Sequence, residues 1–186
     1  MTGLGVLLYG PPAVGKDTLT RQLETLDSRY VAFPRLKAGQ GRVTGYRMTT
    51  VEQLDALDQA GRLLYRNRRY GSDYAVDRAE LDRLLGGGRW PVVHLGQVAG
   101  VDALSRIPVR WVLVLLWCAR ETTLARCEAR GDTDVAARMQ AWDETLADLD
   151  TAVGRDWSVT LKTDRDDVPT DLIAGLIHAE VLAALP

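Results

Sequence analysis

The chain has 186 residues, 46% of them hydrophobic and 26% charged, with a net charge of -2 at neutral pH. This length fits one domain of ordinary size, and the near-neutral charge excludes a chain-wide basic field for nucleic acid or an acidic membrane surface. Two cysteines are too few for a disulfide framework, and the longest apolar run, residues 111–119, is shorter than the roughly 20 residues of a membrane helix. We therefore expect a soluble, cytoplasmic monomer or homodimer with no nucleic-acid or membrane partner.

Short apolar runs typical of buried strands alternate with segments in which apolar residues recur every three or four positions, as they do in helices. The predicted strands are residues 5–9, 30–33, 91–95, 109–117 and 157–161. The predicted helices are residues 18–26, 51–60, 78–85, 98–105, 121–130, 133–153 and 170–185. This alternation favours an α/β fold in which a parallel sheet of about five strands carries helices on both faces.

A glycine-containing loop joins the first predicted strand to the first predicted helix. It reads Gly10-Pro11-Pro12-Ala13-Val14-Gly15-Lys16-Asp17-Thr18 and matches the phosphate-binding pattern Gly-x-x-x-x-Gly-Lys-Ser/Thr except at Asp17. Inward-pointing N–H groups and the positive helix end attract an anion there. Because proline has no N–H group, the donors must come from Ala13 onward. We expect contacts with phosphate along the loop, at Gly10, Ala13, Val14, Gly15, Lys16, Asp17 and Thr18.

Asp17 is the unusual residue of this loop, since a carboxylate there would repel a bare phosphate. The repulsion is removed if Asp17 binds Mg²⁺ directly or through water, because this ion favours oxygen ligands. The alternative is that Asp17 only caps the following helix, as Asp often does. The sequence leaves both interpretations open.

Two segments interrupt the alternation of strands and helices. Residues 35–76 contain one clear helix and a set of basic side chains: Arg35, Lys37, Arg42, Arg47, Arg66, Arg68 and Arg69. Such an insert suits a second anion opposite the phosphate loop, although surface arginines are commonly only solvated. Residues 130–134, Arg-Gly-Asp-Thr-Asp, separate two helices and have the character of a short lid.

Together these features resemble the guanylate kinase family of nucleoside monophosphate kinases over nearly the whole chain. Besides the loop, the likeness rests on Gly61-Arg62-Leu63-Leu64, Tyr70-Gly71-Ser72, Leu124-Ala125-Arg126-Cys127-Glu128-Ala129-Arg130-Gly131 and Arg138. The resemblance implies a three-layer P-loop kinase fold in a single domain that uses ATP and Mg²⁺. It divides the chain into a core of residues 1–34 and 77–186, an acceptor-binding insert of residues 35–76 and a lid of residues 130–138.

The resemblance also assigns roles by position. Arg35 and Tyr70 would hold the phosphate of the acceptor, with Arg42 and Tyr46 as further candidates. Arg126, Arg130 and Arg138 would face the ATP donor. Lys16 of the loop and, by the resemblance, Arg130 and Arg138 are the catalytic candidates, and Asp17 is the candidate metal ligand.

Two departures from the family concern the base of the acceptor. The family reads guanine with two acidic residues, whose positions here hold Tyr65 and, approximately, Gly96. The combination of Asp17, Tyr70-Gly71 and the strand end Val92-Val93-x-x-Gly96 also resembles ribose 1,5-bisphosphate kinases, which need no base reader. His94, at an acidic position of the family's strand, is a substrate-contact candidate or a structural histidine.

The sequence therefore predicts an ATP- and Mg²⁺-dependent phosphotransferase whose acceptor is a small phosphorylated molecule, a sugar phosphate or a nucleoside monophosphate. A phosphate acceptor is largely ionised at neutral pH and requires no general base. Two alternatives remain: a catalytically silent guanylate-kinase-like binding module, and a small-molecule hydroxyl kinase, which would need such a base.

Overall fold

The computed structural model describes residues 3–152, 154–164 and 168–185. Its central sheet has five parallel strands in the order β2-β7-β1-β8-β9. The strands are β1 (Gly3–Tyr9), β2 (Tyr30–Ala32), β7 (Trp90–Leu95), β8 (Val109–Trp117) and β9 (Val159–Lys162). The predicted α/β fold with a parallel sheet of five strands is confirmed.

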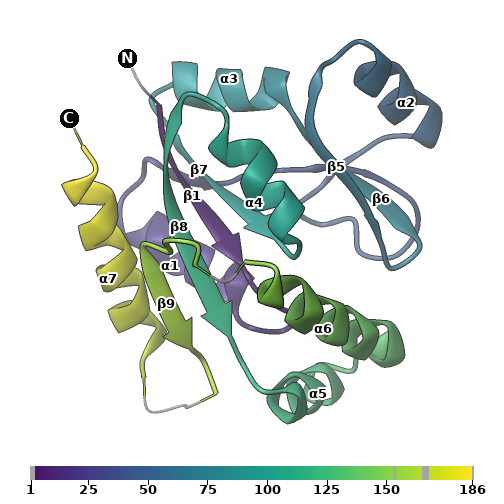
Figure 1. Cartoon of the computed structure of the whole chain (residues 1–186), viewed down its shortest axis with the longest axis vertical. Coiled ribbons are helices and arrows are strands. Elements are labelled where there is room, and N and C mark those ends of the chain that lie inside the picture. The colour runs from purple at the N-terminus through teal and green to yellow at the C-terminus, as the bar shows by residue number, and fades with distance from the viewer. Residues whose placement is uncertain (1–2, 153, 165–167, 186) are drawn as a thin grey trace.

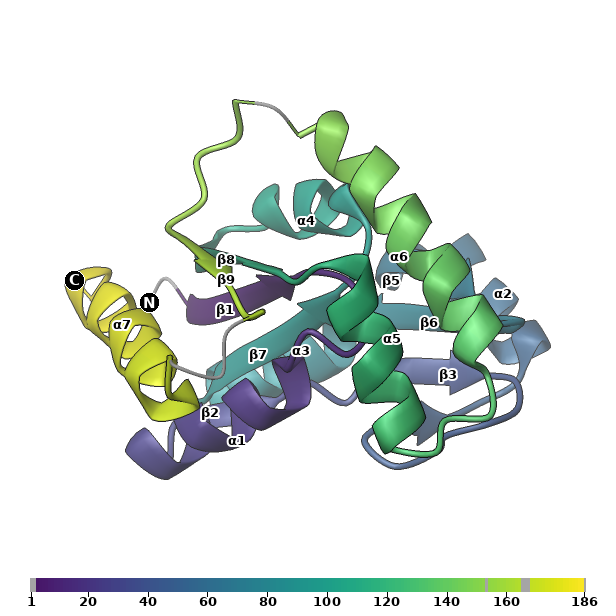
Figure 2. The ribbon, with the colours of Figure 1, turned by 90° about the horizontal axis from the view of Figure 1, so that it is seen from below.

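Helices cover both faces of this sheet (Figures 1 and 2). The covering helices are α1 (Lys16–Leu26), α3 (Arg78–Gly86), α4 (Val98–Ser105) and α7 (Thr170–Ala183). Figure 2 shows α4 on one side of the sheet and α1 with α7 on the other. This arrangement explains why the strands read as continuous apolar runs, since both of their faces are buried.

The central strand β1 divides its side chains between two apolar cores. Leu8 joins the core formed with α1 and α7, whereas Leu7 joins the core formed with α3 and α4. Successive side chains of a strand point to opposite faces, so the same short strand anchors both layers. The carboxyl end of β1 is therefore held from both sides at the point where the phosphate loop begins.

Residues 36–77 form a second sheet that the sequence did not predict. It contains β3 (Leu36–Ala38), β4 (Arg47–Met48), β5 (Leu63–Arg69) and β6 (Ser72–Asp77), in the order β4-β3-β6-β5. Helix α2 (Val51–Gln59) packs on it through Leu54, against Leu36 and Ala75. Two of the strands have only three and two residues, too short for a periodic signal.

Helices α5 (Arg120–Ala129) and α6 (Val135–Asp150) form a hairpin next to the carboxyl ends of the strands (Figure 1). The hydroxyl of Tyr9 at the end of β1 donates to the carbonyl of Thr145 in α6 at 3.2 Å. Val153, the last residue of the helix predicted over residues 133–153, lies outside the described residues. No helix of the described ranges has both the length and the apolar character needed to cross a bilayer.

The packing of α7 can be tested at two adjacent residues. Ile177 is fully buried in the core that α7 shares with α1, whereas Leu176 is 48% exposed. We expect Ile177→Ala to lower the free energy of unfolding by about 2–5 kcal/mol through the lost apolar contacts and the cavity left behind. Leu176→Ala, the matched control, should change it by less than about 0.5 kcal/mol in urea denaturation. Equal effects would contradict this placement of α7.

Candidate functional site

The phosphate loop connects β1 to α1, and its backbone conformation requires glycine at two positions. Gly10 has a φ of +155°, and a Cβ added there would lie 2.2 Å from the carbonyl oxygen of Leu116. Gly15, with a φ of +101°, is the N-cap of α1. The two glycines let the chain turn back beside β8 and enter α1. The amino end of α1 therefore lies at the carboxyl ends of the central strands.

Lys16 is held inside this loop. Its ammonium group donates to the carbonyl oxygens of Gly10 at 2.7 Å and Pro11 at 2.8 Å. Burial and the nearby Arg69 guanidinium lower the pKa of Lys16 to about 7. An anion in the loop would favour the charged ammonium form, so this lysine is suited to bind phosphate oxygens.

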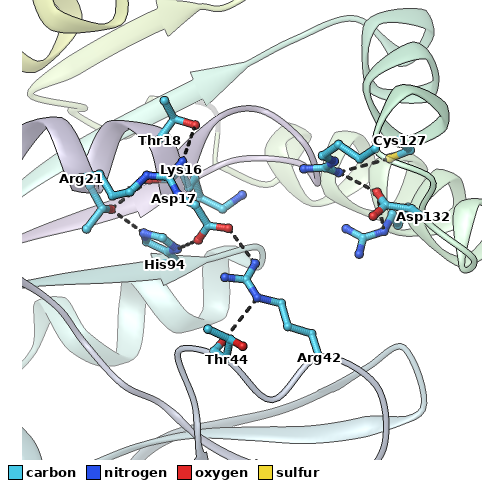
Figure 3. A network of polar contacts seen from close by, with 12 residues as sticks. Lys16, Asp17, Thr18, Arg21, Arg42, Thr44, His94, Cys127 and Asp132 are labelled. Atoms are coloured by element: carbon cyan, nitrogen blue, oxygen red, sulfur yellow. Dashed lines mark hydrogen bonds and ion pairs between the residues drawn. The ribbon is translucent and has the colours of Figure 1, made fainter.

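Asp17 lies in the first turn of α1, but its carboxylate does not cap the helix. Arg42 NH1 donates to Asp17 Oδ2 at 2.7 Å, and His94 Nδ1 lies 3.5 Å from Asp17 Oδ1 (Figure 3). Gly15 is the N-cap residue, so the capping interpretation of Asp17 is wrong. Burial acts to raise the pKa of Asp17, but the hydrogen bond from Arg42 and the surrounding positive charge hold it below its ordinary value. The carboxylate is therefore ionised inside the cleft.

His94 stands near the end of β7, beside Leu8 of β1. Its Nε2 lies 2.7 Å from the hydroxyl of Thr20, which also donates to the carbonyl of Lys16 at 2.9 Å. Burial and the positive charge of Lys16 hold the pKa of His94 well below its usual range. The imidazole is neutral at physiological pH.

The loop that carries Arg42 is organised by Lys37, a basic residue of the insert for which the sequence predicted no individual role. Lys37 is 2% exposed, and its ammonium donates to the carbonyls of Gln40 at 2.6 Å and Arg42 at 2.8 Å. Two donated hydrogen bonds from one charge fix the backbone on both sides of Gly41. This arrangement directs the Arg42 guanidinium towards Asp17.

One cleft of about 990 Å³ contains all the residues that the sequence singled out as site candidates. They are Gly10, Ala13, Val14, Gly15, Lys16, Asp17, Thr18, Arg35, Arg42, Tyr46, Tyr70, Arg126, Arg130 and Arg138. The described lining residues include eight cationic side chains and two carboxylates. In a chain with a net charge of -2, this concentration makes the cleft a site for anions.

Carboxylates hold the arginines at the end of α5 and the start of α6. Arg130 pairs with Asp132 at 2.7 Å, and Arg138 pairs with Asp132 at 3.3 Å and with Asp134 at 2.7 Å. Arg126 instead donates to the carbonyl of Ala13 in the phosphate loop at 3.3 Å. Asp132 thus gathers two arginines at the cleft edge, in a position where the phosphates of a ligand could compete for them.

Arg69 is the main cleft residue to which the sequence analysis assigned no role. Its side chain is 10% exposed, and it donates to the carbonyl of Ala141 at 3.3 Å and to the hydroxyl of Thr145 at 3.1 Å. A Cβ added at Gly96 would lie 2.4 Å from Arg69 NH1. The sequence feature that could have identified Arg69 is the alternation of side chains along β5. Asn67 and Arg69 lie in the cleft, whereas Arg66 points to the other side and pairs with Asp73.

The remaining basic residues of the insert take other places. Arg47 pairs with Asp77, and Arg66 pairs with Asp55 and Asp73. Arg68 is exposed. Of the seven basic residues that the sequence marked in this insert, Arg35, Arg42 and Arg69 line the cleft.

Among the comparisons with known proteins, the one with solved structures agrees with this fold. No protein-family model and no curated protein sequence matches the chain. A guanylate kinase from Anaplasma phagocytophilum is similar in structure, with a TM-score of 0.68 and 14% identity, over 97% of this chain and 87% of that one. A gluconokinase from Sinorhizobium meliloti 1021 is similar with a TM-score of 0.54 and 14% identity, over 97% of this chain and 92% of that one. At this identity the likeness shows the fold alone. The predicted P-loop kinase fold is confirmed, whereas membership of the guanylate kinase family or of the ribose 1,5-bisphosphate kinases is not.

The lowered pKa of Lys16 predicts a pH dependence of anion binding. Because the pKa is about 7, Lys16 is charged below that pH and neutral above it. Sulfate affinity, measured by calorimetry, should fall roughly tenfold from pH 6 to pH 8, since sulfate keeps its charge over this range.

Lys16→Arg provides the control for this measurement, because a guanidinium stays charged at both pH values. The variant should bind sulfate with nearly equal affinity at pH 6 and pH 8. A flat profile in the unmodified protein, or a tenfold fall that persists in Lys16→Arg, would contradict the assignment.

Proposed function

We propose that this protein is a phosphotransferase that moves the γ-phosphoryl group of ATP to a small phosphorylated acceptor. The observation that carries the proposal is the cleft itself. The phosphate loop forms one wall, Arg35 and Arg42 of the insert contribute to the cleft from another segment, and Arg130 and Arg138 stand at the lid. Such a site can hold two groups of phosphates and neutralise the charge that moves between them.

The residues present fit a divalent cation that accompanies the nucleotide. Asp17 supplies a carboxylate at the position after Lys16, where P-loop proteins commonly have a Mg²⁺-binding hydroxyl. No group of three or more His, Cys, Asp or Glu in the described residues is placed to hold a metal by itself. Asp17 would therefore hold a Mg²⁺ ion together with phosphate oxygens and water, and the ion would supply charge neutralisation at the phosphates.

The carboxylates of the cleft favour a phosphate acceptor over a hydroxyl acceptor. A hydroxyl would need a general base in the site. The described lining groups that could act as one are Asp17, Asp132 and His94, and burial holds the pKa of His94 well below its usual range, which makes it a weak base. Arg42 pairs with Asp17, while Arg130 and Arg138 pair with Asp132. A phosphate acceptor is already ionised and leaves these ion pairs free of any proton-transfer role.

The acceptor end of the cleft does not suit guanine. Tyr65 uses its hydroxyl to donate to Gln97 at 2.7 Å, and the Arg69 guanidinium occupies the space beside Gly96. A base with adjacent N–H donors needs carboxylate acceptors, whereas Arg69 offers only donors. An oxygen-rich acceptor such as a sugar phosphate fits this end better than GMP does.

A hydroxyl kinase is the second candidate, favoured by the structural similarity to the gluconokinase. The two candidates differ in their need for a general base. With a hydroxyl acceptor, kcat/KM should show an acidic limb that disappears when one carboxylate is removed. A silent binding module, the third alternative, would bind no ATP in calorimetry although Lys16 is intact.

The proposed function is tested directly with the purified protein, ATP and Mg²⁺. We expect transfer of phosphate from labelled ATP to at least one member of a panel of sugar phosphates and nucleoside monophosphates, with the sugar phosphates preferred. Transfer only to unphosphorylated sugars would favour the hydroxyl kinase. Absence of transfer to every acceptor would contradict the proposal.

Lys16 gives a first mutational prediction for this activity. Lys16→Ala should lower kcat by roughly 100- to 1000-fold or more, because it removes a donor that stabilises charge on the transferring group. Its folding should be nearly unchanged in thermal unfolding, since the ammonium contacts only loop carbonyls. A variant that keeps more than a tenth of the transfer rate would be inconsistent with this role.

Arg35 gives a second prediction, directed at the acceptor. Its guanidinium lines the cleft and stacks over the ring of Tyr74 at 4.9 Å. Arg35→Ala should raise KM for the acceptor by roughly 10- to 100-fold, the value of a hydrogen bond to a charged group, with KM for ATP nearly unchanged. Arg68→Ala, at an exposed arginine of the same insert, is the matched control and should alter neither constant.

A further inference from the structure

Asp17 and His94 present two ligand atoms to each other. Asp17 Oδ1 and His94 Nδ1 are 3.5 Å apart, with Asp17 on the first turn of α1 and His94 near the end of the neighbouring strand β7 (Figure 3). A charge-assisted hydrogen bond between such groups would be about 2.7–2.9 Å long. The pair is therefore not closed by a strong hydrogen bond, and both residues line the cleft.

Thr20 allows His94 to present Nδ1 without a proton on the side of Asp17. Thr20 has a single hydroxyl proton, which is donated to the carbonyl of Lys16 at 2.9 Å. Its oxygen can then accept from His94 Nε2–H at 2.7 Å, and in this tautomer Nδ1 carries no proton and can bind a metal. A metal-ligating histidine commonly donates its other ring N–H to such an oxygen partner.

Asp17 is oriented in a complementary way. Arg42 NH1 binds Oδ2 at 2.7 Å, so the other oxygen, Oδ1, is the one that faces His94. At metal–ligand distances of about 2.1 Å, neighbouring ligand atoms of one ion lie about 3.0–3.4 Å apart. The observed separation of 3.5 Å is close to this value.

We propose that Asp17 Oδ1 and His94 Nδ1 together bind the divalent cation of the proposed reaction, and that the imidazole makes the site favour first-row transition metals over Mg²⁺. The proposal rests on the proposed function, because the remaining ligands would be phosphate oxygens and water. Imidazole nitrogen suits metals such as Co²⁺ and Ni²⁺, whereas Mg²⁺ takes oxygen ligands. The site thus combines an oxygen ligand, Asp17 at the start of α1, with a nitrogen ligand, His94 in β7.

The chain offers a sharp test because it has only two histidines, His94 and His178. His178 contacts Tyr30, through Nδ1 at 3.0 Å from its hydroxyl, and does not line the cleft. Pulsed electron paramagnetic resonance of Mn²⁺ detects a directly bound nitrogen. Inorganic triphosphate replaces ATP as the phosphate ligand, so that no nucleotide base contributes nitrogen.

We expect nitrogen coupling on Mn²⁺ in the unmodified protein with triphosphate. The coupling should be lost in His94→Gln, which keeps a donor for Thr20, and retained in His178→Gln. No coupling with bound Mn²⁺ and triphosphate, or coupling that persists in His94→Gln, would overturn the proposal. If calorimetry shows that triphosphate itself does not bind, the proposed function fails, and the metal site with it.

Metal affinities give an independent readout. With triphosphate present, His94→Gln should weaken Co²⁺ binding at least about tenfold, as the loss of metal-site groups typically does, and should change Mg²⁺ binding less than twofold. His94→Asp should raise the affinity for Mg²⁺, because it adds an oxygen ligand. Equal losses for Co²⁺ and Mg²⁺ in His94→Gln would show that the imidazole does not select the metal.

Discussion

The concentration of positive charge at the carboxyl edge of the central sheet is the constraint on which the site depends. Eight cationic side chains line one cleft of a chain whose net charge is -2. Like charges at this density repel one another when no anion is bound. The structure offsets the repulsion locally: Asp17 holds Arg42, Asp132 holds two lid arginines, and the pKa of Lys16 falls to about 7. Bound phosphates could replace the carboxylates as partners of these arginines and could favour the charged form of Lys16. The groups that repel one another when no anion is bound are therefore the groups that would bind phosphate.

Asp17 connects the parts of the molecule that the proposed reaction would bring together. It belongs to the helix that follows the phosphate loop, pairs with Arg42 of the insert, and faces His94 of the core sheet. A hydroxyl at this position could not form the ion pair with Arg42 at all. The carboxylate of Asp17 therefore links the start of α1 to the insert. Lys37 supports this link because it donates to the backbone carbonyl of Arg42.

The sequence predicted the central sheet well because buried parallel strands give long apolar runs. The residues of the phosphate loop were equally clear, since Gly10 and Gly15 occupy positions that only glycine fits readily. The second sheet could not be read, because β3 and β4 are very short and the arginines of β5 hide its alternation. The sequence marked Arg69 as one of the basic residues of the insert but assigned it no role of its own, because its role depends on contacts with Ala141 and Thr145, which lie more than 70 positions away.

The turn that follows Arg69 shows how local strain supports the site. Arg69 pairs with Ser72 across a two-residue turn in which Tyr70 has a φ of +53° and Gly71 a φ of +69°. Such turns favour Asn or Gly at the first position, and a tyrosine there is strained. In this conformation Tyr70 lines the cleft, and the Arg138 guanidinium of α6 lies 5.9 Å from the centroid of its ring. Tyr70, in the turn between β5 and β6, and Arg138 of α6 thus meet in the cleft.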